Sequence, residues 1–595
     1  MSHEDRCPLP KSGAVIVSFL LVLGTVLLTA LPLTAAPPAA RHAGRTKVAA
    51  AVKPTGGGGC TIQNNNTGSV LPTQGSGVHG DPLFKIVTSQ NFCPDNALVF
   101  RGILQGLGLD LHPAMVANRG FNDPLPAGSF SFFEAVTGNY QGTNLEFGDW
   151  FFGHFQTAVN NNTAGTSVLA EQQQATPDAL LLESVVWDPT VGMYRFYEIR
   201  GDGQGGEWFY RGSSQDIQDD IQNLWRNYDP SEPIFGTAAL GGPRLRCSGC
   251  HMNGGPLMKE LQSPHDSWWR KERPLRFGSM VIQPVIQGIL DNVVDAGDFS
   301  SWVQAGYAKL FNSEQYMQAR SQKSLQEQLR PLFCEQEVNL ESDSRSYTDA
   351  AATIQVPTAF FVDPRLTPDG PKSVAMSKDL YTNALNHFQS SFMDSQNSDQ
   401  TAGIDGDHAF ETPVKGYADI QLINALVKKG LIDDKFVLAA VAVDMTRPMF
   451  SRDRCALLRL LPDKEVSGWQ AELQKKLQAS SSAAAQEFLK NLTDPSRTPA
   501  YHYQRAAKLL KAIQENSVNQ SAVFGYVRLL AQRRIAVFSA QISQNPHGQI
   551  FEPDFRLIFP TFQLIAKDQQ EMAYGGVPGQ YWLNPDTGLV ELAPQ

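Results

Sequence analysis

The 595-residue sequence predicts an α+β protein, with a β-containing amino-terminal domain, a distinct middle segment and a mainly α-helical carboxyl-terminal half. Two observations predict this class. Short β-branched and aromatic runs separated by turn residues cluster between residues 180 and 212, whereas amphipathic helical patterns dominate after about residue 300. Hydrophobic residues make up 42% of the chain, which supplies enough apolar side chains for a folded core.

Residues 1–40 are typical of an export signal. The apolar stretch Gly13–Leu31 follows a short polar segment and precedes Pro/Ala-rich sequence. A stretch of this length can also span a bilayer, so two alternatives stay open: a cleaved signal peptide or an amino-terminal membrane anchor. Both predict an exported chain.

Residues 41–80 are predicted to be a flexible linker. They contain a run of four glycines, the polar run QNNNTGS and few large apolar side chains. Such a composition buries too little apolar surface to fold by itself.

Residues 81–235 are predicted to form the aromatic-rich, β-containing domain. Three runs have strand character, Leu180–Asp188, Gly192–Gly201 and Glu207–Gly212, and turn residues separate them. This pattern predicts a meander of three antiparallel strands. The segment Ser214–Tyr228 then predicts a helix, because a serine precedes a one-sided apolar pattern.

Residues 300–595 are predicted to be mainly helical. The segments share apolar residues at helical spacing on one face. They begin at Ser324, Asp379, Ala418, Trp469, Ser482, Gln504 and Val523.

The charge of the chain argues against nucleic acid as a partner. The formal net charge is -10, and no run of five or more Lys and Arg residues occurs. Binding to a phosphate backbone needs clustered cations, so no nucleic-acid interface is expected.

A C-x-x-C-H motif lies between the two halves, in the sequence GGPRLRCSGCHMNGGPLMKEL. Its members are Cys247, Cys250 and His251. In such a motif two thiols add across the vinyl groups of haem, and the adjacent imidazole is placed to ligate the iron.

The motif resembles that of c-type cytochromes, and the resemblance covers the motif region only. It implies one covalently bound haem c in residues 236–299, attached through Cys247 and Cys250, with His251 as the proximal iron ligand. Unlike small one-haem cytochromes, which carry the motif near the amino terminus, this chain has 246 residues before it. The resemblance therefore does not imply the small cytochrome fold.

Two other uses of the cysteine pair fit the sequence less well. A structural zinc site needs a second Cys/His pair at ligand spacing, and the next such residues are His265 and Cys334. A thioredoxin-like dithiol begins a helix, whereas here Met252–Pro256 (MNGGP) opposes a helix.

The sixth iron ligand decides between electron transfer and catalysis, since a closed iron carries electrons and an open one permits peroxide or dioxygen chemistry. Met258 follows His251 too closely to wrap easily around a haem edge. His265 and Met280 lie far enough along the chain, and they remain equal candidates for the distal ligand.

The remaining exported cysteines predict two disulfides, Cys60 with Cys93 and Cys334 with Cys455, since each pair stays within one half of the chain. Free buried thiols are the alternative. The acidic loop Met393–Glu411 does not fit the EF-hand pattern, so calcium is a disfavoured second cofactor.

These observations predict an exported c-type cytochrome that transfers single electrons through one haem c to or from a redox partner protein. The expected location is the bacterial periplasm or another exported site, with an inner-membrane anchor as the alternative. The competing hypothesis is a haem-dependent peroxidase or oxygenase with an open axial position. The length of the chain favours this enzyme, whereas a single C-x-x-C-H motif argues against it.

Overall fold

The computed structural model describes part of the chain, and all described residues belong to one compact unit, residues 54–595. The described residues are 59–95, 97–118, 130–156, 180–201, 206–219, 247, 251, 253–256, 288–289, 291–294, 296–334, 336–341, 352–384, 412–449, 451–464, 467–530, 533 and 581–592. The predicted α+β class is confirmed, because a strand region precedes a helical carboxyl-terminal half.

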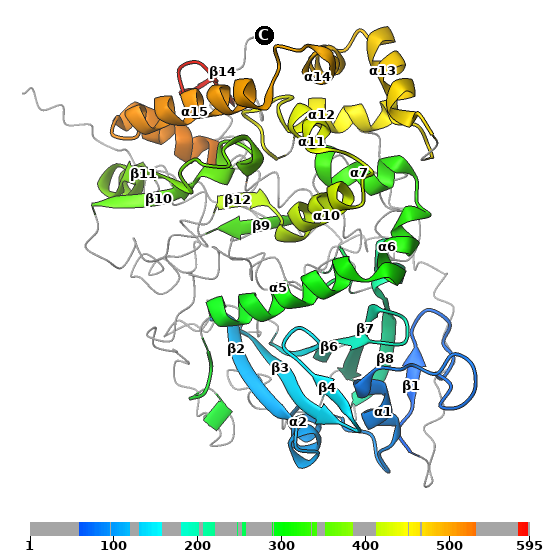
Figure 1. Ribbon diagram of the computed structural model, residues 1–595. Coiled ribbons are helices and arrows are strands. Elements are labelled where there is room, and N and C mark those ends of the chain that lie inside the picture. The colour runs from blue at the N-terminus through cyan, green and yellow to red at the C-terminus, as the bar shows by residue number, and fades with distance from the viewer. Residues whose placement is uncertain are drawn as a thin grey trace, which may run out of the picture. The chain divides into compact units, whose positions relative to one another are not determined.

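An eight-stranded sheet forms the amino-terminal part (Figure 1). Its strands are β1 (Ile62–Asn64), β2 (Asp110–Asn118), β3 (Phe130–Tyr140), β4 (Thr143–Leu145), β5 (Trp150–Gln156), β6 (Leu180–Asp188), β7 (Met193–Gly201) and β8 (Gly206–Ser213). The order is β1-β8-β7-β6-β5-β3-β2, and β4 pairs with β3. The predicted meander is confirmed, because β6, β7 and β8 pair in antiparallel fashion.

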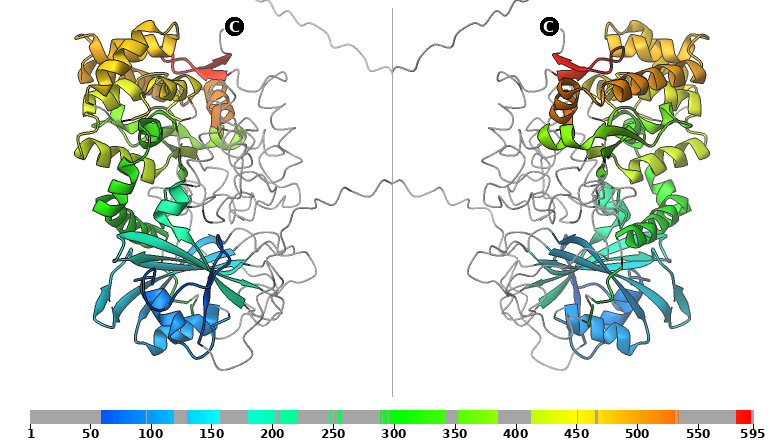
Figure 2. Two further views of the ribbon diagram at one scale, coloured as in Figure 1. Left: turned by 90° about the vertical axis from the view of Figure 1, so that its right-hand side faces the viewer. Right: turned by 90° about the vertical axis from the view of Figure 1, so that its left-hand side faces the viewer.

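Alternation along the strands explains how the sheet is covered on both faces. Val185 and Phe196, paired across β6 and β7, face one core together with Phe299 of α5 (Ala296–Asn312). The neighbouring pairs put Val186 and Tyr197 on the other face, against α1 (Pro82–Thr88) and α2 (Ala97–Gly106). Figure 2 shows α5 on one side of the sheet and the two short helices on the other.

The predicted linker of residues 41–80 is wrong for residues 59–80. Strand β1 pairs in parallel with β8, and Ile62 is completely buried. Cys60 forms a disulfide with Cys93, and the polar run after β1 folds into a turn in which the Asn64 N–H donates to the Ser69 carbonyl at 2.7 Å. The disulfide and the sheet edge hold a segment whose own apolar surface is too small to fold alone.

The carboxyl-terminal half contains α6 (Glu314–Ser321), α7 (Leu325–Phe333), α10 (Tyr417–Lys428), α11 (Asp434–Val441), α12 (Arg452–Ala456), α13 (Trp469–Ala479), α14 (Ala483–Thr493) and α15 (Pro499–Asn516). The periodicity predicts α7, α10, α13, α14 and α15, whereas α6, α11 and α12 were not predicted. Residues 378–384 and 520–530 are also helical. Their apolar faces continue the core that begins at the sheet and α5.

Three two-stranded sheets in this half were not predicted. They pair β9 (Val338–Glu341) with β12 (Thr412–Lys415), β10 (Thr353–Pro357) with β11 (Ser373–Ser377), and β13 (Tyr581–Leu583) with β14 (Val590–Leu592). Each strand has three to five residues, which is too short for alternation to stand out in the sequence.

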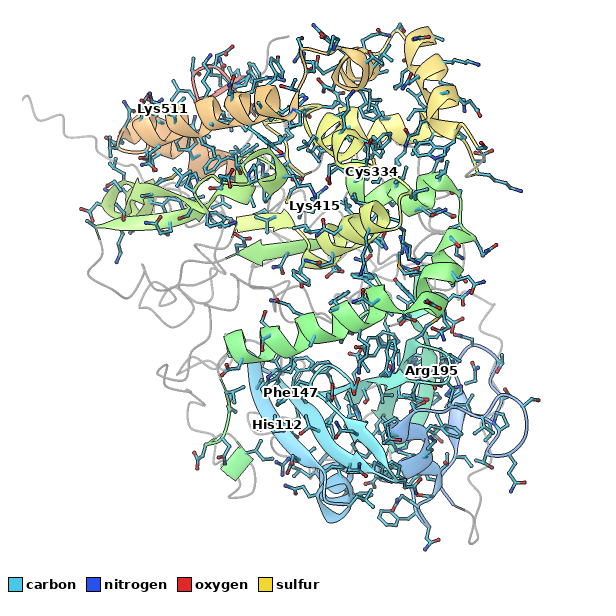
Figure 3. All side chains as sticks on the ribbon, viewed as in Figure 1. His112, Phe147, Arg195, Cys334, Lys415 and Lys511 are labelled. Atoms are coloured by element: carbon cyan, nitrogen blue, oxygen red, sulfur yellow. A yellow bond between two sulfur atoms is a disulfide. The ribbon has the colours of Figure 1, made fainter. Side chains whose placement is uncertain are left out.

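Both predicted disulfides are present. The second joins Cys334, directly after α7, to Cys455 in α12 (Figure 3). Free thiols at these four positions, the alternative left open by the sequence, are therefore excluded.

Several predictions lie outside the described residues: the export signal, Cys250, His265, Met280 and the acidic loop Met393–Glu411. Of the predicted helix Ser214–Tyr228, residues 214–219 are described, and they are helical. In the described ranges, no helix combines the length and the apolar character needed to cross a bilayer. The domain boundaries around residues 236–299 stay predictions.

Candidate functional site

The C-x-x-C-H motif is described at two of its three members, Cys247 and His251. The Cys247 thiol belongs to neither disulfide, and the residue is 3% exposed within the core that includes the sheet face and α5. The His251 N–H donates to the Cys247 carbonyl at 3.0 Å, which closes a turn around the motif. The turn brings the thiol and the imidazole into one buried region.

The two ring nitrogens of His251 have different partners. Nδ1 lies 2.8 Å from the carbonyl oxygen of Gly255, and because a carbonyl only accepts, Nδ1 carries the proton of that bond. Nε2 lies 3.1 Å from Oε1 of Glu183 on β6, and the ring packs at 5.1 Å from the Phe196 ring. Burial alone would lower the pKa of His251, but the Glu183 carboxylate and the Gly255 carbonyl raise it.

The glycines after the motif are required by close contacts. Gly254 has φ of 69°, and a Cβ there would lie 2.5 Å from the Ser214 carbonyl oxygen. A Cβ on Gly255 would lie 2.4 Å from the Tyr307 ring. The Ser214 hydroxyl also donates to the Gly254 carbonyl at 2.7 Å. The sequence MNGGP therefore lets the loop pass between the sheet and α5 while keeping the Gly255 carbonyl at His251.

Asn253 connects this loop to the carboxyl-terminal half. It is fully buried, and its Nδ2 donates to Oε2 of Glu337 at 2.8 Å and to Oδ1 of Asp419 at 3.1 Å. The Tyr316 hydroxyl donates to its backbone carbonyl at 2.8 Å. Burial raises the pKa of Asp419 to about 6, although hydrogen bonds oppose this shift. Glu337, directly before β9, and groups from α10 and α6 thus fix the residue two positions after His251.

The residues described here fit the attachment of a haem c. Cys247 is a buried cysteine that belongs to neither Cys60–Cys93 nor Cys334–Cys455, and thioether formation uses such a cysteine. The backbone carbonyl of Gly255 holds Nδ1 of His251 and thereby presents Nε2 as the coordinating nitrogen, an arrangement common among metal-ligating histidines. The Glu183 carboxylate now contacts Nε2, so it would yield this position to the iron.

A site built from protein ligands alone has no counterpart in the described ranges. They hold no group of three or more His, Cys, Asp or Glu side chains arranged to bind a metal ion. The acidic loop Met393–Glu411, for which calcium is a disfavoured cofactor, lies outside these ranges, so that expectation stays untested.

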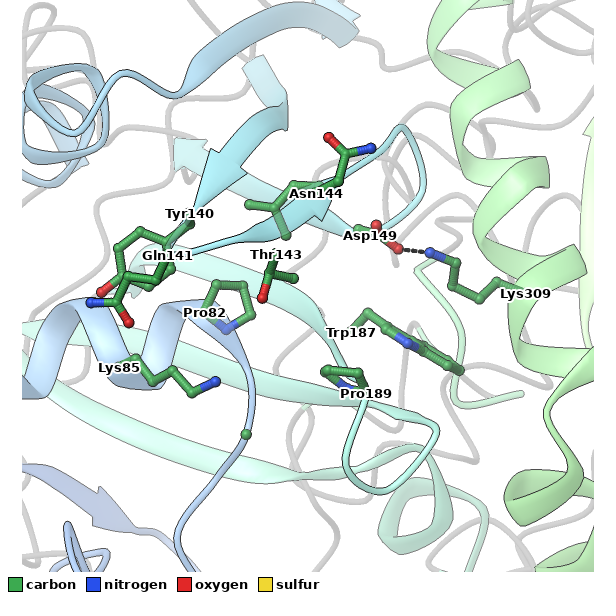
Figure 4. A pocket seen from close by; sticks show the side chains of 12 residues that line it. Pro82, Lys85, Tyr140, Gln141, Thr143, Asn144, Asp149, Trp187, Pro189 and Lys309 are labelled. Carbon is green, nitrogen blue, oxygen red and sulfur yellow. Dashed lines mark hydrogen bonds and ion pairs between the residues drawn. The ribbon is translucent and has the colours of Figure 1, made fainter.

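A separate cavity of about 220 Å³ lies between α1, the β3–β4 turn, the β6–β7 turn and α5 (Figure 4). Asn144 and Lys85 contribute polar groups to its wall, and Lys309 forms an ion pair with Asp149. The Lys309 ammonium is 5.8 Å from the centre of the Trp187 ring. The cavity can accommodate a small polar molecule, and nothing in the sequence predicted it because its walls come from four distant segments.

Sequence reasoning also missed a buried polar cluster between β7 and the start of α1. The Tyr197 hydroxyl lies 2.6 Å from Nδ1 of His79 and donates to Oδ2 of Asp81, also at 2.6 Å. Arg195, labelled in Figure 3, pairs with Asp188, which accepts from the Gly80 N–H at 3.2 Å. The sequence His79-Gly80-Asp81-Pro82 indicates a helix start. It does not indicate that Tyr197, more than 100 positions later, joins the side chains of His79 and Asp81.

Comparisons of the chain with protein-family models, with curated proteins and with solved structures found no match.

Proposed function

We propose that this protein is an exported c-type cytochrome that carries single electrons through one covalently bound haem c. The observation that carries the proposal is the motif Cys247-x-x-Cys250-His251, in which Cys247 is buried and the His251 imidazole is buried and oriented by the Gly255 carbonyl. The protein exchanges these electrons with a redox partner protein. The location is the bacterial periplasm or another exported site, with residues 1–40 as signal or anchor.

Each residue has a defined task in this proposal. Cys247 and Cys250 would hold the cofactor covalently, and His251 would bind the iron through Nε2. The haem supplies a metal centre that accepts and releases one electron. The Gly255 carbonyl keeps the proton on Nδ1 and prevents the ring from turning. The buried surroundings of the loop exclude water from this side chain.

The disulfides support the export part of the proposal. Cys60–Cys93 and Cys334–Cys455 are both formed, and structural disulfides persist in oxidising compartments such as the periplasm. The two cysteines of the C-x-x-C-H motif belong to neither of these disulfides, which is consistent with cysteines that serve two separate purposes.

The direct test is the intact mass of denatured protein made in a host that attaches haem c. We expect the mass of one haem to remain with the chain, because a thioether bond survives denaturation. The double substitution Cys247→Ala/Cys250→Ala should abolish the added mass. The matched control Cys60→Ala/Cys93→Ala removes a disulfide and should retain the added mass of one haem. A wild-type chain without added mass would disprove the proposal.

Carbon monoxide separates the carrier from the enzyme with an open iron. A reduced carrier with two protein ligands should keep its visible spectrum when carbon monoxide is added. Substituting His265 and Met280 one at a time, and looking for a change to a carbon-monoxide-sensitive spectrum, identifies the sixth ligand. A wild-type spectrum that shifts with carbon monoxide would favour the peroxidase or oxygenase instead.

A further inference from the structure

Arg320, in α6, is a buried cation that forms no ion pair with a carboxylate in the described parts of the chain. The residue is 2% exposed, and none of its Nε, Nη1 and Nη2 atoms makes a hydrogen bond of ordinary geometry there. A guanidinium has five N–H donors and stays charged in proteins. Leaving such a charge buried without a partner is strongly destabilising, so an arrangement of this kind points to an absent anion.

The position of Arg320 relates it to the loop that carries His251. Tyr316 lies one helical turn earlier in α6, and its hydroxyl donates to the Asn253 carbonyl at 2.8 Å. Burial raises the pKa of Tyr316, while the charge of Arg320 and a side-chain hydrogen bond with it lower this pKa, so the guanidinium lies beside the phenol and still lacks an anion. One hydrogen-bonded side chain therefore separates Arg320 from the segment directly after the haem motif.

Arg320 also lines a cavity. It has a volume of about 520 Å³, and α6, α7 and the end of α10 line it. Gln328 and Lys429 add polar groups to its wall, and Glu314 adds one negative charge. Of the charged groups that line it, two are cations and one is an anion, so the cavity itself favours a negatively charged occupant.

We propose that Arg320 binds a carboxylate, and that a propionate of the haem c attached at Cys247 and Cys250 supplies it. The planar guanidinium matches a carboxylate through two parallel hydrogen bonds, which satisfies the unused donors and neutralises the charge. The assignment of the propionate rests on the proposed function. A free carboxylate that enters through the 520 Å³ cavity is the other source of the same chemistry.

The test compares one substitution in two forms of the full chain. Arg320→Met keeps the length of the side chain and removes the charge. In the apoprotein, made with Cys247→Ala/Cys250→Ala, we expect it to raise the melting temperature, because it removes an unpaired buried charge. In the haem-loaded protein we expect it to lower the melting temperature, because it removes the propionate's partner. Arg320→Lys keeps the positive charge but cannot form the two parallel hydrogen bonds of a guanidinium. It provides a second variant should the methionine variant fail to fold.

Arg454 is the matched control. It is also fully buried, but its guanidinium donates to the carbonyls of Arg447 and Pro448 at 3.0 and 2.7 Å. Arg454→Met should therefore lower the melting temperature equally with and without haem. An Arg320→Met shift of the same sign in both forms would overturn the assignment of the propionate.

Titration of the apoprotein with sodium propionate, against sodium chloride at equal ionic strength, tests the other source. Stabilisation of the apoprotein by propionate that Arg320→Met abolishes would show the carboxylate site without the cofactor. If the wild-type chain takes up no haem, the proposed function fails first, and this titration alone decides whether Arg320 binds a carboxylate. If sodium propionate and sodium chloride then stabilised the apoprotein equally, the proposal that Arg320 binds a carboxylate would be disproved as well.

Discussion

Gly255 is held so closely by the Tyr307 ring that it accepts no larger side chain. We expect Gly255→Ala to lower the free energy of unfolding by roughly 1–3 kcal/mol, because the new methyl group must displace a buried ring. Gly102, exposed in α2 with no atom near its missing Cβ, is the control, and Gly102→Ala should be neutral or stabilise by about 0.4–1 kcal/mol. Urea unfolding measures both, and equal effects would contradict the prediction.

The His79–Tyr197–Asp81 cluster predicts two opposite dependences on pH. Burial raises the pKa of Asp81 to about 7, whereas burial and the charge of Arg195 lower that of His79 to about 4. Above the unfolded pKa of 3.8, folded Asp81 keeps a proton that the unfolded chain releases, so its contribution to stability falls as pH rises to about 7. Below the unfolded pKa of 6.5, the unfolded chain binds a proton that folded His79 rejects, so its contribution rises from about pH 4.

Asp81→Asn and His79→Gln separate these contributions. The stability of the wild type minus that of Asp81→Asn should fall between pH 4 and 7, since asparagine retains the cap of α1 without titrating. The corresponding difference for His79→Gln should rise between pH 4 and 6.5. Chemical denaturation at a series of pH values gives both curves, and two flat differences would refute the titration.

The site residues that the sequence reveals are those that chemistry places next to each other in the chain. Cys247, Cys250 and His251 can be identified because the proposed attachment of haem would fix their spacing. Glu183, which contacts His251 from 68 positions away, has no such signature. The sequence does not single out Arg320 either, because the residue becomes buried without an anionic partner only when α6 packs against the rest of the chain.

Helix α7 shows how an element can be read from its first turn. Ser324 accepts from the Glu327 N–H, and the Glu327 side chain accepts in return from the Ser324 N–H. This capping box satisfies two backbone donors at the helix start. The apolar stripe behind it packs into the core, and the disulfide at Cys334 follows the last turn.

Ser324→Ala should therefore lower the free energy of unfolding by about 0.5–2 kcal/mol. Ser482 occupies the equivalent position of α14 but makes no side-chain hydrogen bond there, so Ser482→Ala should change stability far less. Urea titration of the two variants side by side gives the comparison. A larger loss at Ser482 than at Ser324 would contradict the capping argument.

The elements that the sequence predicted are the long periodic ones, α7, α10 and α13 to α15, and the three strands of the meander. Periodicity identifies such segments because many side chains repeat the same pattern. Strands β9 to β14 each have at most five residues, and their partners are separated by loops or helices, so local sequence cannot reveal the pairing. Strand β1 was mistaken for linker because only its tertiary partners make it ordered.

At the scale of the whole molecule, the two disulfides should differ in effect. Cys334–Cys455 spans 121 residues and Cys60–Cys93 spans 33. Because the entropy removed from the unfolded chain grows with the logarithm of this span, losing the longer link should cost about 1 kcal/mol more. Urea unfolding of Cys334→Ala/Cys455→Ala and Cys60→Ala/Cys93→Ala measures the two losses. A greater loss for the shorter link would show that local contacts outweigh chain entropy.

The pairing of β1 with β8 sets an order of assembly. Ile62 lies beside Trp208, so a polypeptide that emerges amino-terminus first carries an unpaired edge while almost 150 further residues are delivered. Until β8 arrives, that segment presents bare amides to any neighbouring chain, a state that invites misassociation. A holdase that shields the waiting segment would therefore protect the nascent sheet.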